Sequence, residues 1–68
     1  MNDDIATELH DRLAALRREH RALDEEISAL AEAPQADLFQ IQRLKRRKLQ
    51  MKDEIVRIES MILPDIIA

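Results

Sequence analysis

Apolar residues recur along the second half of the chain at alternating spacings of three and four, and this repeat constrains the fold more than any other feature. Such spacing places side chains on one stripe of an α-helix, at positions a and d of a heptad whose positions are labelled a to g. Lys48 is the one polar member of the stripe, which we call the seam of this helix. The whole seam consists of Ile41, Leu44, Lys48, Met51, Ile55, Ile58 and Ile62. We therefore predict a helix from about residue 38 to about residue 63 that needs an apolar partner.

The first half of the chain carries a matching seam, with His20 as its one polar member, and we predict a helix from about residue 4 to about residue 32. Its members are Leu9, Leu13, Leu16, His20, Leu23, Ile27 and Leu30. Pro34 disfavours helix at the residue before it, so the first helix ends there. Asp37, with Gln40 three residues later, has the spacing of a capping box that starts the second helix. The link of about residues 33–37 is short, and short links join antiparallel neighbours.

Folding the chain back on itself pairs the two seams without a slip. Each a residue meets a d residue of the other helix, from Leu30 with Ile41 at the link to Leu9 with Ile62 at the far end. The residue numbers in every intervening pair have the same sum, so no insertion interrupts the register. We predict an all-α fold, an antiparallel two-helix coiled-coil hairpin that forms a single domain.

Some of the charged residues on the two sides of the seams support the antiparallel register, and others oppose it. The register sets Asp24 beside Lys45 and Glu26 beside Arg47, and the Lys48 ammonium can reach Asp24 from within the seam. The same register sets two pairs of like charges side by side, which a second molecule would have to compensate. These pairs are Arg17 with Lys52 and Glu19 with Glu54.

Composition agrees with long helices and excludes several classes of protein. The chain of 68 residues has no glycine, and Phe39 is its only aromatic residue. It has no cysteine, so it forms neither disulfides nor thiolate metal sites. No apolar run approaches the roughly 20 residues of a membrane-spanning helix. The first residues, MNDDIATE, are acidic and unlike a secretory or transit signal, so we expect a cytoplasmic protein without membrane contact.

Apolar residues outside the seams predict further partners. Leu49, Val56 and Leu63 form a second stripe at position b, and small residues (Ala15, Ala22 and Ala29) form one at position c of the first helix. A lone hairpin buries one narrow face of each helix, so we predict a homodimer that forms a four-helix bundle, with another helical protein as the second class of partner. The residues expected to bind a partner are Leu49, Val56 and Leu63, together with Ile66 and Ile67 of the apolar tail at residues 64–68.

Chemical sites are not evident in the sequence. His10 and His20 fall at different heptad positions, e and a, and no catalytic, phosphate-binding or metal-binding motif is present. We expect no enzymatic activity, no catalytic residue, no metal and no cofactor. The alternative function is nucleic-acid binding through the basic run Arg43–Lys48, with Arg43 and Arg46 as the phosphate contacts.

The residues of the two seams and their flanks also resemble a known family. The segments that carry the resemblance are His20, Leu23-Asp24, Ile27, Leu30, Asp37, Leu44-Lys45, Lys48-Leu49 and Met51-Lys52-Asp53-Glu54-Ile55. Together they resemble the YdcH-like small bacterial proteins over roughly Leu16–Ile58. That family is a domain of unknown function, and the resemblance implies a short cytosolic helical hairpin in bacteria. It implies no catalytic or binding residue.

Overall fold

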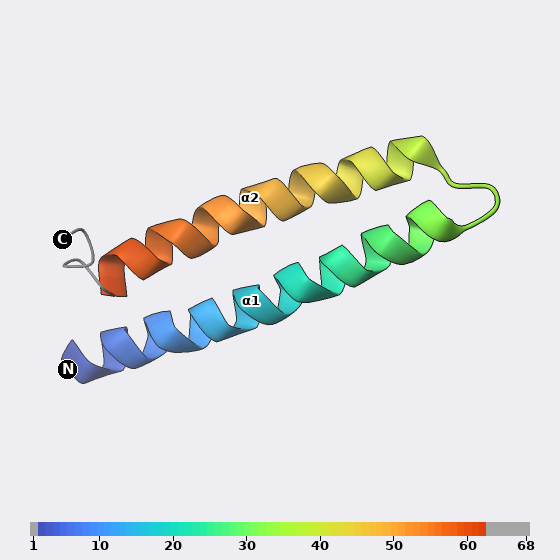
Figure 1. Cartoon of the computed structure of the whole chain (residues 1–68). Helices are drawn as coiled ribbons and strands as arrows, with labels where there is room; N and C mark the ends of the chain where they lie inside the picture. The colour runs from blue at the N-terminus through green and yellow to red at the C-terminus, as the bar shows by residue number, and fades with distance from the viewer. Residues whose placement is uncertain (1, 63–68) are drawn as a thin grey trace, which may run out of the picture.

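Two long helices, joined by a short link, make up the computed structural model, which describes residues 2–62, with side chains from residue 5 onward. Helix α1 spans Asn2–Glu32 and helix α2 spans Leu38–Ile62. The helices lie side by side and run in opposite directions, so the start of α1 and the end of α2 lie at the same end of the molecule (Figure 1). The all-α antiparallel hairpin predicted from the heptad repeat is thereby confirmed.

The link closes without a glycine. Ala33 N–H donates to the Leu30 carbonyl at 3.3 Å, and within residues 2–62 no backbone φ is positive. Asp37 caps α2, as the sequence predicts, because its Oδ1 accepts hydrogen bonds from the N–H groups of Phe39 at 3.0 Å and Gln40 at 3.2 Å. Within the described residues, the Gln40 side chain does not accept a hydrogen bond from the backbone N–H of Asp37. Only one of the two hydrogen bonds of the predicted capping box therefore forms.

The core is a single row of side chains between the helices, and every predicted seam position is buried or half-buried. The buried residues are Leu13, Leu16, Leu23 and Ile27 of α1 and Ile41, Met51, Ile55 and Ile58 of α2. None of the described side chains is fully shielded from solvent. The radius of gyration is 15.5 Å, whereas a compact domain of this length has about 11 Å. The molecule is therefore elongated, and most of its side chains lie at the surface.

Neither α1 nor α2 has an apolar stretch long enough to cross a membrane.

Candidate functional site

A polar layer interrupts the apolar core near the middle of the hairpin. Lys48 Nζ donates a hydrogen bond of 2.6 Å to Asp24 Oδ1, as the sequence predicts, and both side chains keep part of their surface in solvent. His20 Nδ1 lies 3.9 Å from Asp24 Oδ2, too far for a hydrogen bond. The hydrogen bond from Lys48 holds the pKa of the Asp24 carboxyl below its ordinary value of 3.8, against the opposing effect of desolvation. The layer joins Lys48, a seam residue of α2, to Asp24, which flanks the seam of α1, and this contact favours a single register.

Two further ion pairs bind the helices together, and they differ from the pairs predicted at the flanks. Arg12 Nη2 lies 2.6 Å from Glu54 Oε2, and Arg17 Nη2 lies 2.6 Å from Glu59 Oε2. The hydrogen bond from Arg12 to Glu54, together with the charge of Glu54, raises the pKa of the Arg12 guanidinium. Each pair joins a flanking position of α1 to the same heptad position of α2.

The predicted flanking pairs of Asp24 with Lys45 and of Glu26 with Arg47 are not among the ion pairs of the described residues. A flanking residue has two candidate neighbours on the other helix, seven residues apart, and opposite charge selects between them. Arg17 therefore turns away from Lys52 to Glu59. Glu54, predicted to face Glu19, is instead paired with Arg12. One member of each predicted repulsive pair, Arg17 in the first and Glu54 in the second, thus finds a partner of opposite charge within the same chain.

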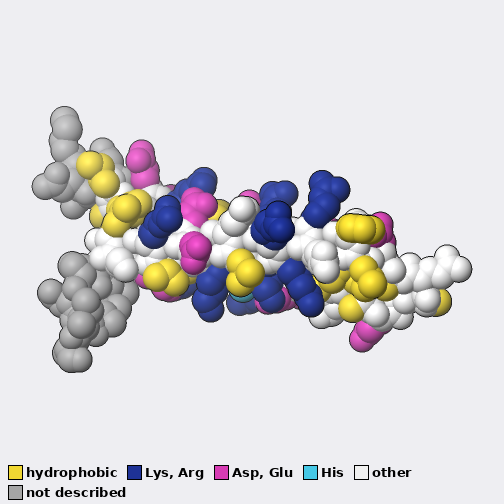
Figure 2. Space-filling view, turned by 90° about the horizontal axis from the view of Figure 1, so that it is seen from above, with side chains coloured by type: hydrophobic (Ala, Val, Ile, Leu, Met, Phe, Trp, Pro, Cys, Tyr) yellow, Lys and Arg dark blue, Asp and Glu magenta, His cyan; other side chains and the backbone are white. Residues whose placement is uncertain are grey.

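The stripe at position b of α2 remains at the surface. Leu49 is 65% exposed and Val56 is 48% exposed. The two residues lie on the same face of α2, two helical turns apart. Figure 2, which looks down on the hairpin from the α2 side, shows hydrophobic side chains lying among basic and acidic ones. We call Leu49 and Val56, with the charged side chains beside them, the outer face of α2. The other members of the predicted partner set, Leu63, Ile66 and Ile67, lie outside the described residues.

The alanine stripe of α1 lies on the opposite edge of the hairpin from the outer face of α2. Position c lies next to g, on the d side of the helix, whereas position b lies next to e, on the a side, and in an antiparallel pair the e positions of both helices share one edge and the g positions the other. Ala15 is half-buried, and Ala22 and Ala29 are exposed. The two stripes that the sequence suggests for a partner therefore do not form one continuous surface.

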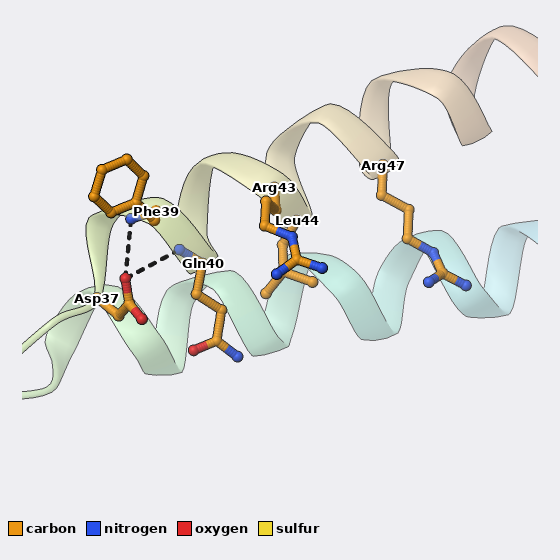
Figure 3. Close-up of a pocket in the computed structure, with 6 residues that line it drawn as sticks. All are labelled: Asp37, Phe39, Gln40, Arg43, Leu44 and Arg47. Atoms are coloured by element: carbon orange, nitrogen blue, oxygen red, sulfur yellow. Dashed lines mark hydrogen bonds between the residues drawn. The ribbon is translucent and has the colours of Figure 1, made fainter.

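At the link end, Arg43 lies in a surface hollow of about 350 Å³. Its other lining residues are Asp37, Phe39, Gln40, Leu44 and Arg47. Figure 3 shows the Phe39 ring on the other side of the α2 backbone from the Gln40 and Arg43 side chains. The structure brings Arg43 together with Arg47 and not with Arg46, which does not line the hollow. Sequence reasoning missed Arg47 because it assigned that residue to Glu26, although its spacing of four from Arg43 already placed both on one face.

The open end of the hairpin carries an apolar hollow that the sequence reasoning also missed. It is lined by Ile5, Ala6, Leu9, His10, Met61 and Ile62. Ile5 and Met61 are 60% and 64% exposed. Both residues occupy position g near the last seam pair, Leu9 with Ile62, and this shared position was the available signal.

The two histidines lie in different surroundings. His10 lines the open-end hollow, and His20 belongs to the polar layer. Over the part of the chain that the structure describes, no three histidine, aspartate or glutamate side chains gather closely enough to hold a metal ion.

Comparison with known proteins shows the family of this chain. A family model described as "Protein of unknown function (DUF465)" matches residues 13–59, which is more than half of the chain and includes most of both seams. The YdcH-like resemblance of the sequence is consistent with this match. No curated protein and no solved structure matches the chain.

Proposed function

This chain belongs to the DUF465 family, whose description assigns no function, and we propose that it is a non-catalytic coiled-coil interaction module. In this proposal it acts by self-association, as a homodimer, and by offering helix faces to other helical proteins. The proposal includes the cytoplasmic, bacterial setting that the family resemblance implies.

The observation that carries the proposal is the exposure of the outer face of α2. The hairpin completes its seam without Leu49 and Val56, so these two side chains add nothing to the core of the isolated chain. They are large and apolar, and they recur after seven residues on one face, which is the spacing with which a helix meets another helix. Covering them would remove apolar surface from water and so favour association.

Sedimentation equilibrium over a dilution series tests self-association. We expect a mass of two chains that persists to low micromolar concentration. Replacing both Leu49 and Val56 with glutamine should raise the dissociation constant about a hundredfold or more, because each loss occurs in both copies. A wild-type chain that stays monomeric across the series would refute self-association.

The chain provides a matched control for this substitution. Ile5 and Met61 are exposed to a similar degree as Leu49 but lie at the open end on the other edge of the hairpin. The Ile5→Gln/Met61→Gln variant should keep the wild-type dissociation constant. If it dissociates instead, and the Leu49→Gln/Val56→Gln variant does not, the interface lies at the open end and the outer face of α2 is not the surface used.

Nucleic-acid binding is the second candidate, and the hollow at the link end favours it. Arg43 and Arg47 line one hollow, and Phe39 is 82% exposed at the same end of α2, with its ring on the other side of the helix backbone. Arginines contact phosphates, and an exposed aromatic ring can stack on a base of a single strand. The acidic residues of α1 and the net charge of −3 weigh against this candidate.

A mobility-shift assay with single-stranded oligonucleotides at about 50 mM salt separates the two candidates. If nucleic acid is the partner, binding should weaken as salt rises and should be lost in the Arg43→Glu/Arg46→Glu and Arg43→Glu/Arg47→Glu variants. The Arg18→Glu/Arg21→Glu variant carries the same change of charge on the exposed side of α1 and should bind like the wild type. Absence of any shift at low salt would remove this candidate.

A further inference from the structure

We propose that the apolar tail at residues 64–68 folds back onto the open-end hollow of its own chain, where Ile66 and Ile67 cover Ile5 and Met61. The tail lies outside the described residues, so the structure shows the surface and the sequence supplies its occupant. The inference goes beyond the proposed function and does not rest on self-association, because one chain contains both sides of the contact.

Helix α1 extends past the end of α2 and offers apolar side chains with no described helix opposite them (Figure 1). The last seam pair is Leu9 with Ile62, and residues 2–8 of α1 continue beyond it for about 10 Å. Ile5 and Ala6 lie on this extension, and both line the open-end hollow, which has a volume of about 350 Å³. The surface that needs a cover is therefore the extension of α1 together with the last turn of α2.

A continued α2 would not supply this cover. Pro64 disfavours helix at the residue before it, and α2 ends at Ile62. The next seam position after Ile62 would be residue 65, which is an aspartate, and Ile66 and Ile67 would fall at positions e and f. A continued helix would thus place an aspartate, and neither isoleucine, at the seam.

The tail can reach the open-end hollow but not the link end of the hairpin. Residues 63–68 span at most about 20 Å when fully extended, whereas the hairpin is 51 Å long. Ile62 lines the hollow, and the tail follows it after one residue. A short tether holds such a segment at a local concentration in the millimolar range, far above that of a second chain at micromolar concentration. The tail of the same chain is therefore the favoured occupant.

The chemistry of the tail matches that of the hollow. Ile66 and Ile67 are aliphatic, and the hollow is lined by apolar residues apart from His10. Covering Ile5 and Met61, which are 60% and 64% exposed, would remove apolar surface from water. The contact would withdraw the open end from partner binding and leave the outer face of α2 available.

Nuclear Overhauser effects between methyl groups test the contact directly in the full chain. We expect cross-peaks from Ile66 or Ile67 to Ile5 or Leu9, with the tail signals assigned by Ile66→Val and Ile67→Val variants. Thr7 is the internal control, because it is exposed near the same end of α1 but does not line the hollow, and its methyl group should show no cross-peak to the tail. In an equimolar mixture of labelled and unlabelled chains, a spectrum filtered for contacts between chains should lack these cross-peaks.

Melting temperatures at one fixed protein concentration measure how the two sides of the contact are coupled. Ile66→Gln/Ile67→Gln should lower the melting temperature by about 4 °C or more. In the Ile5→Gln/Met61→Gln background the same tail substitution should have about half that effect or less, because the side chains that the tail covers have already been replaced. The Leu49→Gln/Val56→Gln background is the matched control, and the full effect should remain there.

The outcomes separate this inference from the proposed function. Cross-peaks within one chain, together with the reduced effect in the Ile5→Gln/Met61→Gln background, support the inference for a monomer and a dimer alike. Cross-peaks between chains would place the tail in the hollow of a second copy, and cross-peaks to Val56 would place it on the outer face of α2. Either result, an absence of cross-peaks, or an equal effect in all backgrounds overturns the inference. Sedimentation equilibrium decides self-association separately, so the two proposals fail by different measurements.

Discussion

Leu16→Ala should lower the free energy of unfolding by about 2–5 kcal/mol, whereas Leu38→Ala should change it by no more than about 0.5 kcal/mol. Leu16 is 6% exposed and belongs to the core cluster, so its truncation loses buried apolar surface and leaves a cavity. Leu38 is 70% exposed at the start of α2 and loses little. Because the core is one row of side chains and small domains are only marginally stable, the first change should remove a large share of the total stability.

Urea unfolding followed by circular dichroism measures both changes on one scale. The pair forms a matched control, because the same atoms are deleted at a buried and at an exposed position. The two variants should have similar helicity when folded, since alanine is at least as good a helix former as leucine. Equal losses of stability at the two positions would mean that Leu16 does not lie between the helices, and the seam of α1 would then be wrong.

The seams could be predicted from the sequence because period and register are properties of the chain alone. Leu16 and Ile55 each belong to a seam whose members follow one another at heptad spacing. Only one antiparallel alignment pairs all members of both seams. The end of α1 was also predictable, because Pro34 excludes a continuing helix. The structure places every one of these residues as the pattern predicts.

The choice among flanking partners could not be predicted in the same way. Arg17 has Lys52 and Glu59 within reach of its long side chain, and the repeat alone does not say which one it contacts. The hollow at the link end shows the same limit, because it depends on where Arg43 and Arg47 turn after the helix has formed. Side-chain length, rather than helix geometry, decides these contacts.

Lys48→Leu should raise the melting temperature by about 4–8 °C, and Lys48→Glu should lower it. Lys48 occupies a seam position, and its side chain is 32% exposed, so most of its length already packs between the helices. A leucine there would bury apolar surface in the same layer without holding a charge near the core. A glutamate would instead lie beside Asp24 and replace an attraction with a repulsion. Thermal unfolding of the three proteins at neutral pH measures both changes, and a melting temperature unaffected by either would mean that the register of α2 is wrong.

The acid side of the stability curve tests the contact with Asp24 separately from packing. The pKa of Asp24 lies below its ordinary value of 3.8 because Lys48 donates a hydrogen bond to the carboxylate. The stability from this contact is therefore present above pH 3.8 and is lost as the pH falls through the lowered pKa. The Lys48→Leu variant lacks the contact, so its advantage over the wild type should grow as the pH is lowered through that window. Contacts that do not involve residue 48 are common to both proteins, so their effects cancel in the difference. An advantage that stays constant through the window would mean that the ion pair with Asp24 contributes nothing, and that Lys48 acts in the seam through its aliphatic stem alone.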